Sequence, residues 1–248
     1  MVGSNDSISP PNVVLNAIVA EAFSDACDYL EKEDDFDTAV HNLIKEQAIA
    51  HQRIVFNGNG YSQEWVEEAE RRGLPNIKSL VDAVPALTTD KTIALFEKFN
   101  VFTKAELESR AEILYENYSK ALNIEARTMI DMAGKQIIPS VIKYTTFLAN
   151  SINAVKSACG DAADTSAQEG LLVGTSSLLA EAKAALAKLQ AAAEKGSAMD
   201  AGREQAAYYR DEIKADMDAL RAPVDQLEMM VDKEMWPMPS YGDLIFEV

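Results

Sequence analysis

Residues 53–65, RIVFNGNGYSQEW, have the order of side chains from which a phosphate-binding loop could be built. An apolar run, the sequence Asn57-Gly58-Asn59-Gly60 and a helix-forming segment follow one another there, and the amides at the start of a helix attract anions. The motif is incomplete, because Gln63 replaces the third glycine of G-x-G-x-x-G and no lysine follows as in G-x-x-x-x-G-K-[ST]. We therefore predict a turn, with glycines at positive φ after a helix and Ser62 capping the next one. Anion binding by the amides of that next helix is the alternative.

Other side chains that could do chemistry are isolated along the chain. His41 and His51 are the only histidines, and ten residues apart they do not share a helix face as an i, i+4 metal pair would. The acidic run 31–37 lacks the spacing of a calcium loop and is expected to be a solvated charged segment. Cys27 and Cys159 form no C-x-x-C pair, and the prediction for Cys27 is a buried thiol in the core. The residues therefore predict no catalytic, metal-binding or cofactor-binding side chain in this chain.

Charge and composition narrow the class of protein. The 248 residues include 48% hydrophobic ones, enough to bury a core, and carry a formal charge of −17. Nucleic acid and anionic membrane surfaces would repel such a protein. The amino terminus does not resemble a secretion signal, and no stretch reaches the roughly 18 uncharged apolar residues of a membrane span. We expect a soluble, cytoplasmic protein with neither a nucleic acid nor a membrane partner.

The elements that position these residues are predicted to be helices. Only 11 glycines and 8 prolines occur, and alanine, leucine, glutamate and lysine dominate the second half. After Pro10 and Pro11, an apolar stripe through Val14, Ile18 and Ala22 predicts an amphipathic helix. Asp37 is expected to cap a second helix, which ends just before the NGNG sequence.

A long helix is predicted from Lys104. Thr103 and Glu106 form a capping box, with Phe102 and Leu107 at staple spacing. Apolar residues then recur at steps of three and four over residues 104–157, and Pro139 predicts a kink or break near Ile138.

The second half predicts a bundle. Residues 157–176 mix glycine with small polar side chains and are expected to be a loop, whereas 176–232 show two apolar stripes that predict a helical hairpin. The fold class is therefore all-α, an elongated antiparallel bundle of long helices with short connecting helices and an extended C-terminal tail. We divide the chain into a helical segment with the NGNG turn, residues 1–102, and a long-helix bundle, residues 103–248.

The tail, residues 233–248, ends in MWPMPSYGDLIFEV. Trp236, Tyr241 and Phe246 give it large aromatic side chains, which favour burial in a groove. That groove could belong to this bundle or to a partner, and the sequence does not decide between the two. Together with Asn57, Gly58, Asn59, Gly60 and Tyr61, these aromatic residues are the candidate interface or structural sites.

Four segments in this order resemble one family, the type III glutamine synthetases, in their C-terminal region. They are GSNDSISPPNVVLNAIVAEA at 3–22, RIVFNGNGYSQEWVEEAERRGLPN at 53–76, the run from FEKFNVFTKAELESR to VIKY at 96–144, and the tail. The likeness spans nearly the whole chain and is weakest over 157–222.

The resemblance implies that the whole enzyme makes glutamine from glutamate, ammonia and ATP, with Mg or Mn. The family's metal-binding and arginine motifs precede this region, so the resemblance places no catalytic or cofactor-binding residue in the chain. The helix after Pro10 and Pro11 would then follow the catalytic sheet. The chain would act in subunit assembly and in support of the catalytic domain, its expected partner, in a homo-oligomer of nitrogen metabolism. Two alternatives are one half of a split or truncated synthetase, active only with its catalytic half, and a stand-alone helical scaffold or regulator.

Overall fold

The computed structural model describes residues 7–246, so the ends of the two terminal segments quoted above lie outside the described residues. Within 7–246 every regular element is a helix and no strand occurs, which confirms the all-α prediction. The α-helices are α1 (Ser9–Leu30), α2 (Phe36–Ala50), α3 (Gln63–Arg71), α4 (Leu80–Ala83), α5 (Asp90–Lys98), α6 (Lys104–Met132), α7 (Ile138–Cys159), α8 (Ser166–Ser197), α9 (Arg203–Tyr208), α10 (Lys214–Glu228) and α11 (Tyr241–Phe246). Short 3-10 turns cover Gln52–Ile54, Val84–Thr88 and Gly160–Ala162.

The chain forms two compact units, Met1–Ile113 and Leu114–Val248. The division falls inside α6, which contributes residues to both units, whereas the sequence pattern had suggested a division at residues 102–103.

In the first unit, α1 packs against α2 and α5. Ala17 of α1 is buried with Phe96 of α5 and Leu107 at the start of α6. The predicted capping box is confirmed, because the Thr103 N–H donates to Glu106 Oε2 at 2.8 Å and the Glu106 N–H donates to Thr103 Oγ1 at 3.3 Å. These bonds fix where α6 begins.

The cap of α2 differs from the sequence prediction. Asp35, not Asp37, occupies the cap position, and its carboxylate accepts hydrogen bonds from the Thr38 N–H and hydroxyl. Asp37 lies in the first turn of the helix instead. Either aspartate could cap a helix. The backbone is extended at Asp35, so α2 starts directly after that residue.

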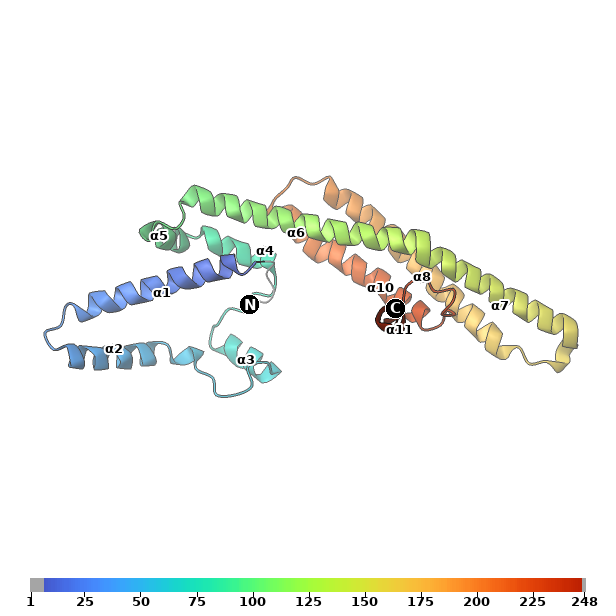
Figure 1. Cartoon of the computed structure of the whole chain (residues 1–248), viewed down its shortest axis with the longest axis horizontal. Coiled ribbons are helices and arrows are strands. Elements are labelled where there is room, and N and C mark those ends of the chain that lie inside the picture. The colour runs from blue at the N-terminus through green and yellow to red at the C-terminus, as the bar shows by residue number, and fades with distance from the viewer. Residues whose placement is uncertain (1–6, 247–248) are drawn as a thin grey trace. The chain divides into compact units, whose positions relative to one another are not determined.

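The second unit is a bundle of three rods: α6 continued by α7, then α8, then α9 continued by α10 (Figure 1). Two buried clusters join all three rods, one around Ala126, Leu189 and Ile213 and the other around Val141, Ala182 and Leu227. The predicted stripe of the long helix is confirmed, because its members from Leu107 to Ile152 are buried or half-buried. The short connection between α8 and α9 makes these two rods antiparallel neighbours.

The interruption expected near Ile138 is a π-helical turn, Ala133–Ile137. Pro139 has no N–H and its ring would clash with the carbonyl four residues earlier in an α-helix. The widened turn, closed by the Ile138 N–H donating to the Ala133 carbonyl, accommodates the proline. Figure 1 shows α7 continuing α6 beyond it.

The loop predicted for 157–176 is shorter than expected, since α8 begins at Ser166. Gly174 lies within the helix, where an added Cβ would come 3.1 Å from the Met230 Cε, so the glycine admits a close neighbour rather than breaking the helix. Helix α8 is long enough and apolar enough to cross a membrane. Core helices of soluble proteins also meet these two criteria. In this structure 17% of its apolar 18-residue window is buried, and Ala182, Leu186 and Leu189 pack in the bundle.

Candidate functional site

The NGNG segment is a surface loop. It joins the 3-10 turn Gln52–Ile54, which follows α2, to α3. Its closing contact is a stack of the Phe56 ring on the Trp65 ring, with centroids 4.4 Å apart and planes inclined by 26°. Ser62 caps α3 as predicted, because its side chain accepts from the Trp65 N–H. The aromatic stack and the cap thus fix both ends of the loop.

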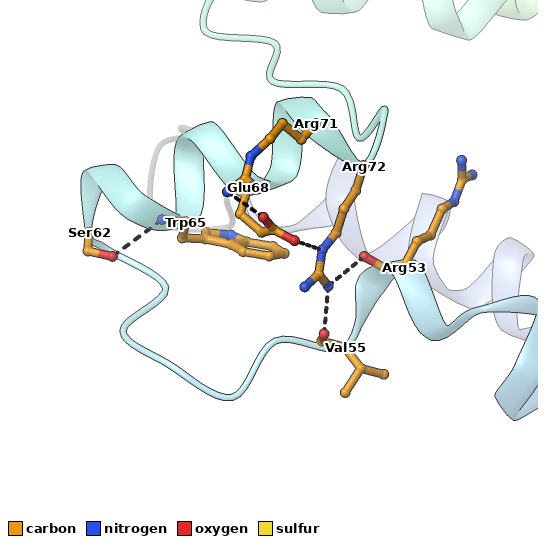
Figure 2. Close-up of polar contacts among 7 residues, drawn as sticks. All are labelled: Arg53, Val55, Ser62, Trp65, Glu68, Arg71 and Arg72. Atoms are coloured by element: carbon orange, nitrogen blue, oxygen red, sulfur yellow. Dashed lines mark hydrogen bonds and ion pairs between the residues drawn. The ribbon is translucent and has the colours of Figure 1, made fainter.

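Arg72 holds the incoming chain against α3. Its Nη1 donates to the main-chain carbonyls of Arg53 at 3.1 Å and Val55 at 2.7 Å, and its Nε donates to Glu68 (Figure 2). Arg71 forms a second ion pair with Glu68 at 2.6 Å. The hydrogen bond from Arg72, together with the charges of both arginines, lowers the pKa of Glu68 below its usual value. A negative Glu68 therefore keeps the Arg72 guanidinium aimed at the loop.

The glycines of the loop do not play the predicted part. Around this loop and α3 the glycine with positive φ is Gly73, at 69°, which follows α3, whereas neither Gly58 nor Gly60 has positive φ. The Leu74 N–H donates to the Ala69 carbonyl at 2.9 Å, so Gly73 completes a Schellman ending. Gly58 leaves room for the Phe56 ring, because an added Cβ would lie 2.6 Å from the Phe56 Cζ.

The tip of the loop faces solvent. Asn57, Asn59 and Gly60 are exposed, and Tyr61 is 93% exposed. The Tyr61 N–H donates to Asn59 Oδ1 at 3.0 Å, and Ser62 donates to the Asn59 carbonyl from its N–H at 3.1 Å and its hydroxyl at 2.8 Å. The loop is thus an ordered projection that presents amide and aromatic groups to solvent.

A second feature, which the sequence prediction missed, lies on α1. Its helical face opposite the buried side carries five exposed apolar residues, which we call the α1 stripe: Leu15, Ile18, Val19, Ala22 and Phe23. Ile18 and Ala22 were expected to belong to a core stripe with Val14, but only the Val14 side packs on the unit's core. The spacing 15, 19, 22 was readable in the sequence, yet spacing does not tell which of two apolar faces is covered.

Comparison with known proteins assigns the chain to a family. Residues 39–156 match the family described as Glutamine synthetase C-terminal domain. Over 99% of the chain, 37% of residues are identical to a glutamine synthetase of Butyrivibrio fibrisolvens and 32% to a type-3 glutamine synthetase of Dictyostelium discoideum. A glutamine synthetase of Bacteroides fragilis is 29% identical over 98% of the chain.

The chain is homologous to the C-terminal region of the type III glutamine synthetases. It spans about a third of the length of these relatives, 35% of the Butyrivibrio protein and 34% of the other two.

Within this glutamine synthetase region, the three aromatic residues of the tail have different environments. Trp236 packs partly buried on the cluster around Val141 and Leu227, and the Ser140 hydroxyl donates to the neighbouring Met235 carbonyl. Tyr241 and Phe246 belong to α11, and both are exposed. The tail is therefore docked on its own bundle at Trp236, and the prediction of an extended segment is wrong for 241–246, which are helical.

Side chains of the glutamine synthetase region that could bind metal or act as nucleophiles are dispersed. Among residues 7–246 no three histidines, cysteines or acids lie together as metal ligands would. Cys27 and Cys159 are exposed free thiols, so the prediction that Cys27 is buried in the core is wrong. The His51 ring contacts the Gln47 side chain at 2.9 Å, within its own helical segment.

Proposed function

We propose that this chain is the noncatalytic C-terminal helical part of a type III glutamine synthetase and that it serves subunit assembly and support of the catalytic part. In the whole enzyme, that catalytic part would join glutamate and ammonia using ATP with Mg or Mn. The protein would be a cytoplasmic homo-oligomer of nitrogen metabolism. The homology to the C-terminal region of these enzymes, with the resemblance implying that the metal-binding and arginine motifs precede it, supports the noncatalytic role.

The observation that carries the proposal is the α1 stripe. Leu15, Val19 and Phe23 are 52%, 50% and 68% exposed although they sit at i, i+4 and i+8 of a regular helix. Fully burying a side chain of this kind is worth roughly 1.5–3 kcal/mol. Contiguous apolar patches on a protein surface are typical of interaction sites. On α2, Phe36 and Ile44 are exposed as well.

The partner that we assign to the α1 stripe is the catalytic part of the enzyme. The relatives contain about twice as much additional chain as this region, and the family resemblance implies that α1 would follow the catalytic sheet. A helix that follows a sheet commonly covers it, and its apolar stripe then faces the sheet. The charge of −17 argues against nucleic acid and anionic membranes as alternative partners.

Activity assays on separated parts test the noncatalytic role. The purified chain, incubated with glutamate, ammonia, ATP and Mg²⁺ or Mn²⁺, is expected to form no glutamine above the blank. The remaining two-thirds of the Butyrivibrio fibrisolvens enzyme should gain activity when the chain is added. Glutamine formation by the chain alone would contradict the proposal. So would a two-thirds fragment whose activity and oligomeric state do not change when the chain is added.

A further inference from the structure

The loop contains the two Asn-Gly sequences of the chain, Asn57-Gly58 and Asn59-Gly60. In such a sequence the main-chain nitrogen of the glycine can attack the side-chain amide carbon of the asparagine, since no Cβ hinders it. An N–C bond forms, the C–N bond to the side-chain nitrogen breaks, and ammonia leaves with the proton from the glycine nitrogen. Water then opens the resulting succinimide at either carbonyl and gives aspartate or isoaspartate.

We propose that Asn59 is a built-in deamidation site, at which the Gly60 nitrogen closes the succinimide ring and releases ammonia. The reaction needs only water as a co-reactant. It is independent of the proposed assembly role, because the groups that carry it all lie between Asn59 and Ser62.

The side-chain carbonyl of Asn59, which is the group attacked, already has a main-chain hydrogen-bond donor. The Tyr61 N–H donates to Asn59 Oδ1 at 3.0 Å. During attack on the side-chain carbon, negative charge develops on this oxygen, and a main-chain donor already in place stabilises it as an oxyanion hole does.

The peptide bond that contains the nucleophile is also hydrogen-bonded. The Gly60 nitrogen must lose its proton to attack, and the resulting charge is shared with the carbonyl oxygen of the same peptide bond, that of Asn59. This oxygen accepts two hydrogen bonds from Ser62, at 2.8 Å from the hydroxyl and 3.1 Å from the N–H. Hydrogen bonds to a charged oxygen are stronger than those to a neutral one, so both donors favour the deprotonated nitrogen.

The reacting groups are open to solvent. Asn59 and Gly60 are exposed, and an added Cβ at Gly60 would meet nothing within 4 Å. In the described part of the chain, none of the donors that act on Asn59 contacts the side chain or carbonyl of Asn57. We therefore expect Asn59 to react before Asn57, by about fivefold if the donors contribute about 1 kcal/mol.

The product changes the loop in two ways. Each event replaces a neutral amide with a carboxylate in a chain whose formal charge is already −17. Isoaspartate also inserts one extra carbon into the main chain, which would displace the Tyr61 N–H from its acceptor. The loop is thereby converted irreversibly from an amide-bearing to an acidic surface.

The test incubates the full 248-residue chain at neutral and mildly alkaline pH and follows residues 53–72 by peptide mass spectrometry, with isoaspartate quantified enzymatically. Gly60→Ala is the decisive variant, because the structure has room for the methyl group and φ is not positive. It should slow conversion at Asn59 by roughly tenfold, since the Cβ crowds the attacking nitrogen. Tyr61→Phe retains the main-chain donor and should react at the normal rate.

Comparison with the same chain unfolded in urea separates the structural claim from the reactivity of the dipeptide. Conversion of Asn59 in the folded chain at or above its rate in the unfolded chain, ahead of Asn57, supports the proposal. Slower conversion of Asn59 in the folded chain than in the unfolded one overturns it, as does a rate no greater than that of Asn57. Asn100, exposed but followed by valine, is the internal reference and should stay unmodified over the same period.

Discussion

Replacing Arg72 with methionine should open the NGNG loop without unfolding the rest of the protein. Methionine keeps much of the apolar stem but removes both hydrogen bonds to the carbonyls of Arg53 and Val55, at 3.1 and 2.7 Å. It also removes the contact of the guanidinium with the Trp65 ring, 5.7 Å from the centroid.

The size of the expected effect follows from the two hydrogen bonds by which Arg72 holds the loop. A hydrogen bond to a charged donor contributes about 1.5–3 kcal/mol, but Arg53 and Val55 are exposed and water would replace the lost donors. We therefore expect the free energy of opening the loop to fall by about 1–2 kcal/mol, which corresponds to a roughly 5- to 30-fold change in the open population.

Amide hydrogen exchange measures this opening directly. The informative amides are those of Val55 and Ser62, which donate to the carbonyls of Gln52 and Asn59. Their exchange should accelerate by the stated factor, while amides buried in the bundle keep their rates.

The matched control is Arg71→Met on the neighbouring residue. Arg71 has a side chain that is 73% exposed and pairs with Glu68, and exposed ion pairs contribute little to stability. If exchange of the Val55 and Ser62 amides accelerated equally in Arg71→Met and Arg72→Met, or in neither, the role of Arg72 in holding the loop would be refuted.

Three further expectations follow from the same structure. Leu186→Ala removes a side chain that is 1% exposed at the centre of the bundle and should lower the free energy of unfolding by about 2–5 kcal/mol, measured by urea denaturation. Gly58→Ala should destabilise the loop because its methyl group would strike the Phe56 ring, seen as faster exchange and altered tryptophan fluorescence, whereas Gly60→Ala, whose methyl group would meet nothing within 4 Å, should leave both unchanged. Hydrogen bonds from Lys233 and Ser240 lower the pKa of Asp243 to about 2. The cap of α11 should therefore be intact above pH 4 and lost as the pH falls through 2. An NMR titration in which the chemical shift of the Ser240 amide changed near pH 4 would contradict this.

The long helices could be predicted from sequence because burial repeats at the helical period over many turns. Leu107, Ala126 and Val141 all lie on the buried face that their spacing indicates. The position of the interruption before Pro139 was also predictable, since the missing N–H of proline has one local consequence. Its form as a π-helical turn was not, because that depends on how the rest of the bundle holds both helical segments in line.

The candidate site was less predictable for physical reasons. Arg72 contacts carbonyls 17 and 19 residues earlier, and no local pattern encodes a side chain that reaches distant main chain. The glycine with positive φ is set by where α3 ends, at Gly73, and not by the density of glycines at 58 and 60. α1 has two apolar faces, and its packing against α2, α5 and the start of α6 decides which one is covered.

The most direct test of the account is binding between this chain and the other two-thirds of a type III glutamine synthetase, measured by sedimentation velocity. The chain with Leu15→Ser and Phe23→Ser in the α1 stripe should lose the complex, while Ile124→Ser, an equally exposed apolar residue on α6, should retain it. A complex that survives both substitutions in the α1 stripe would contradict the role assigned to this surface.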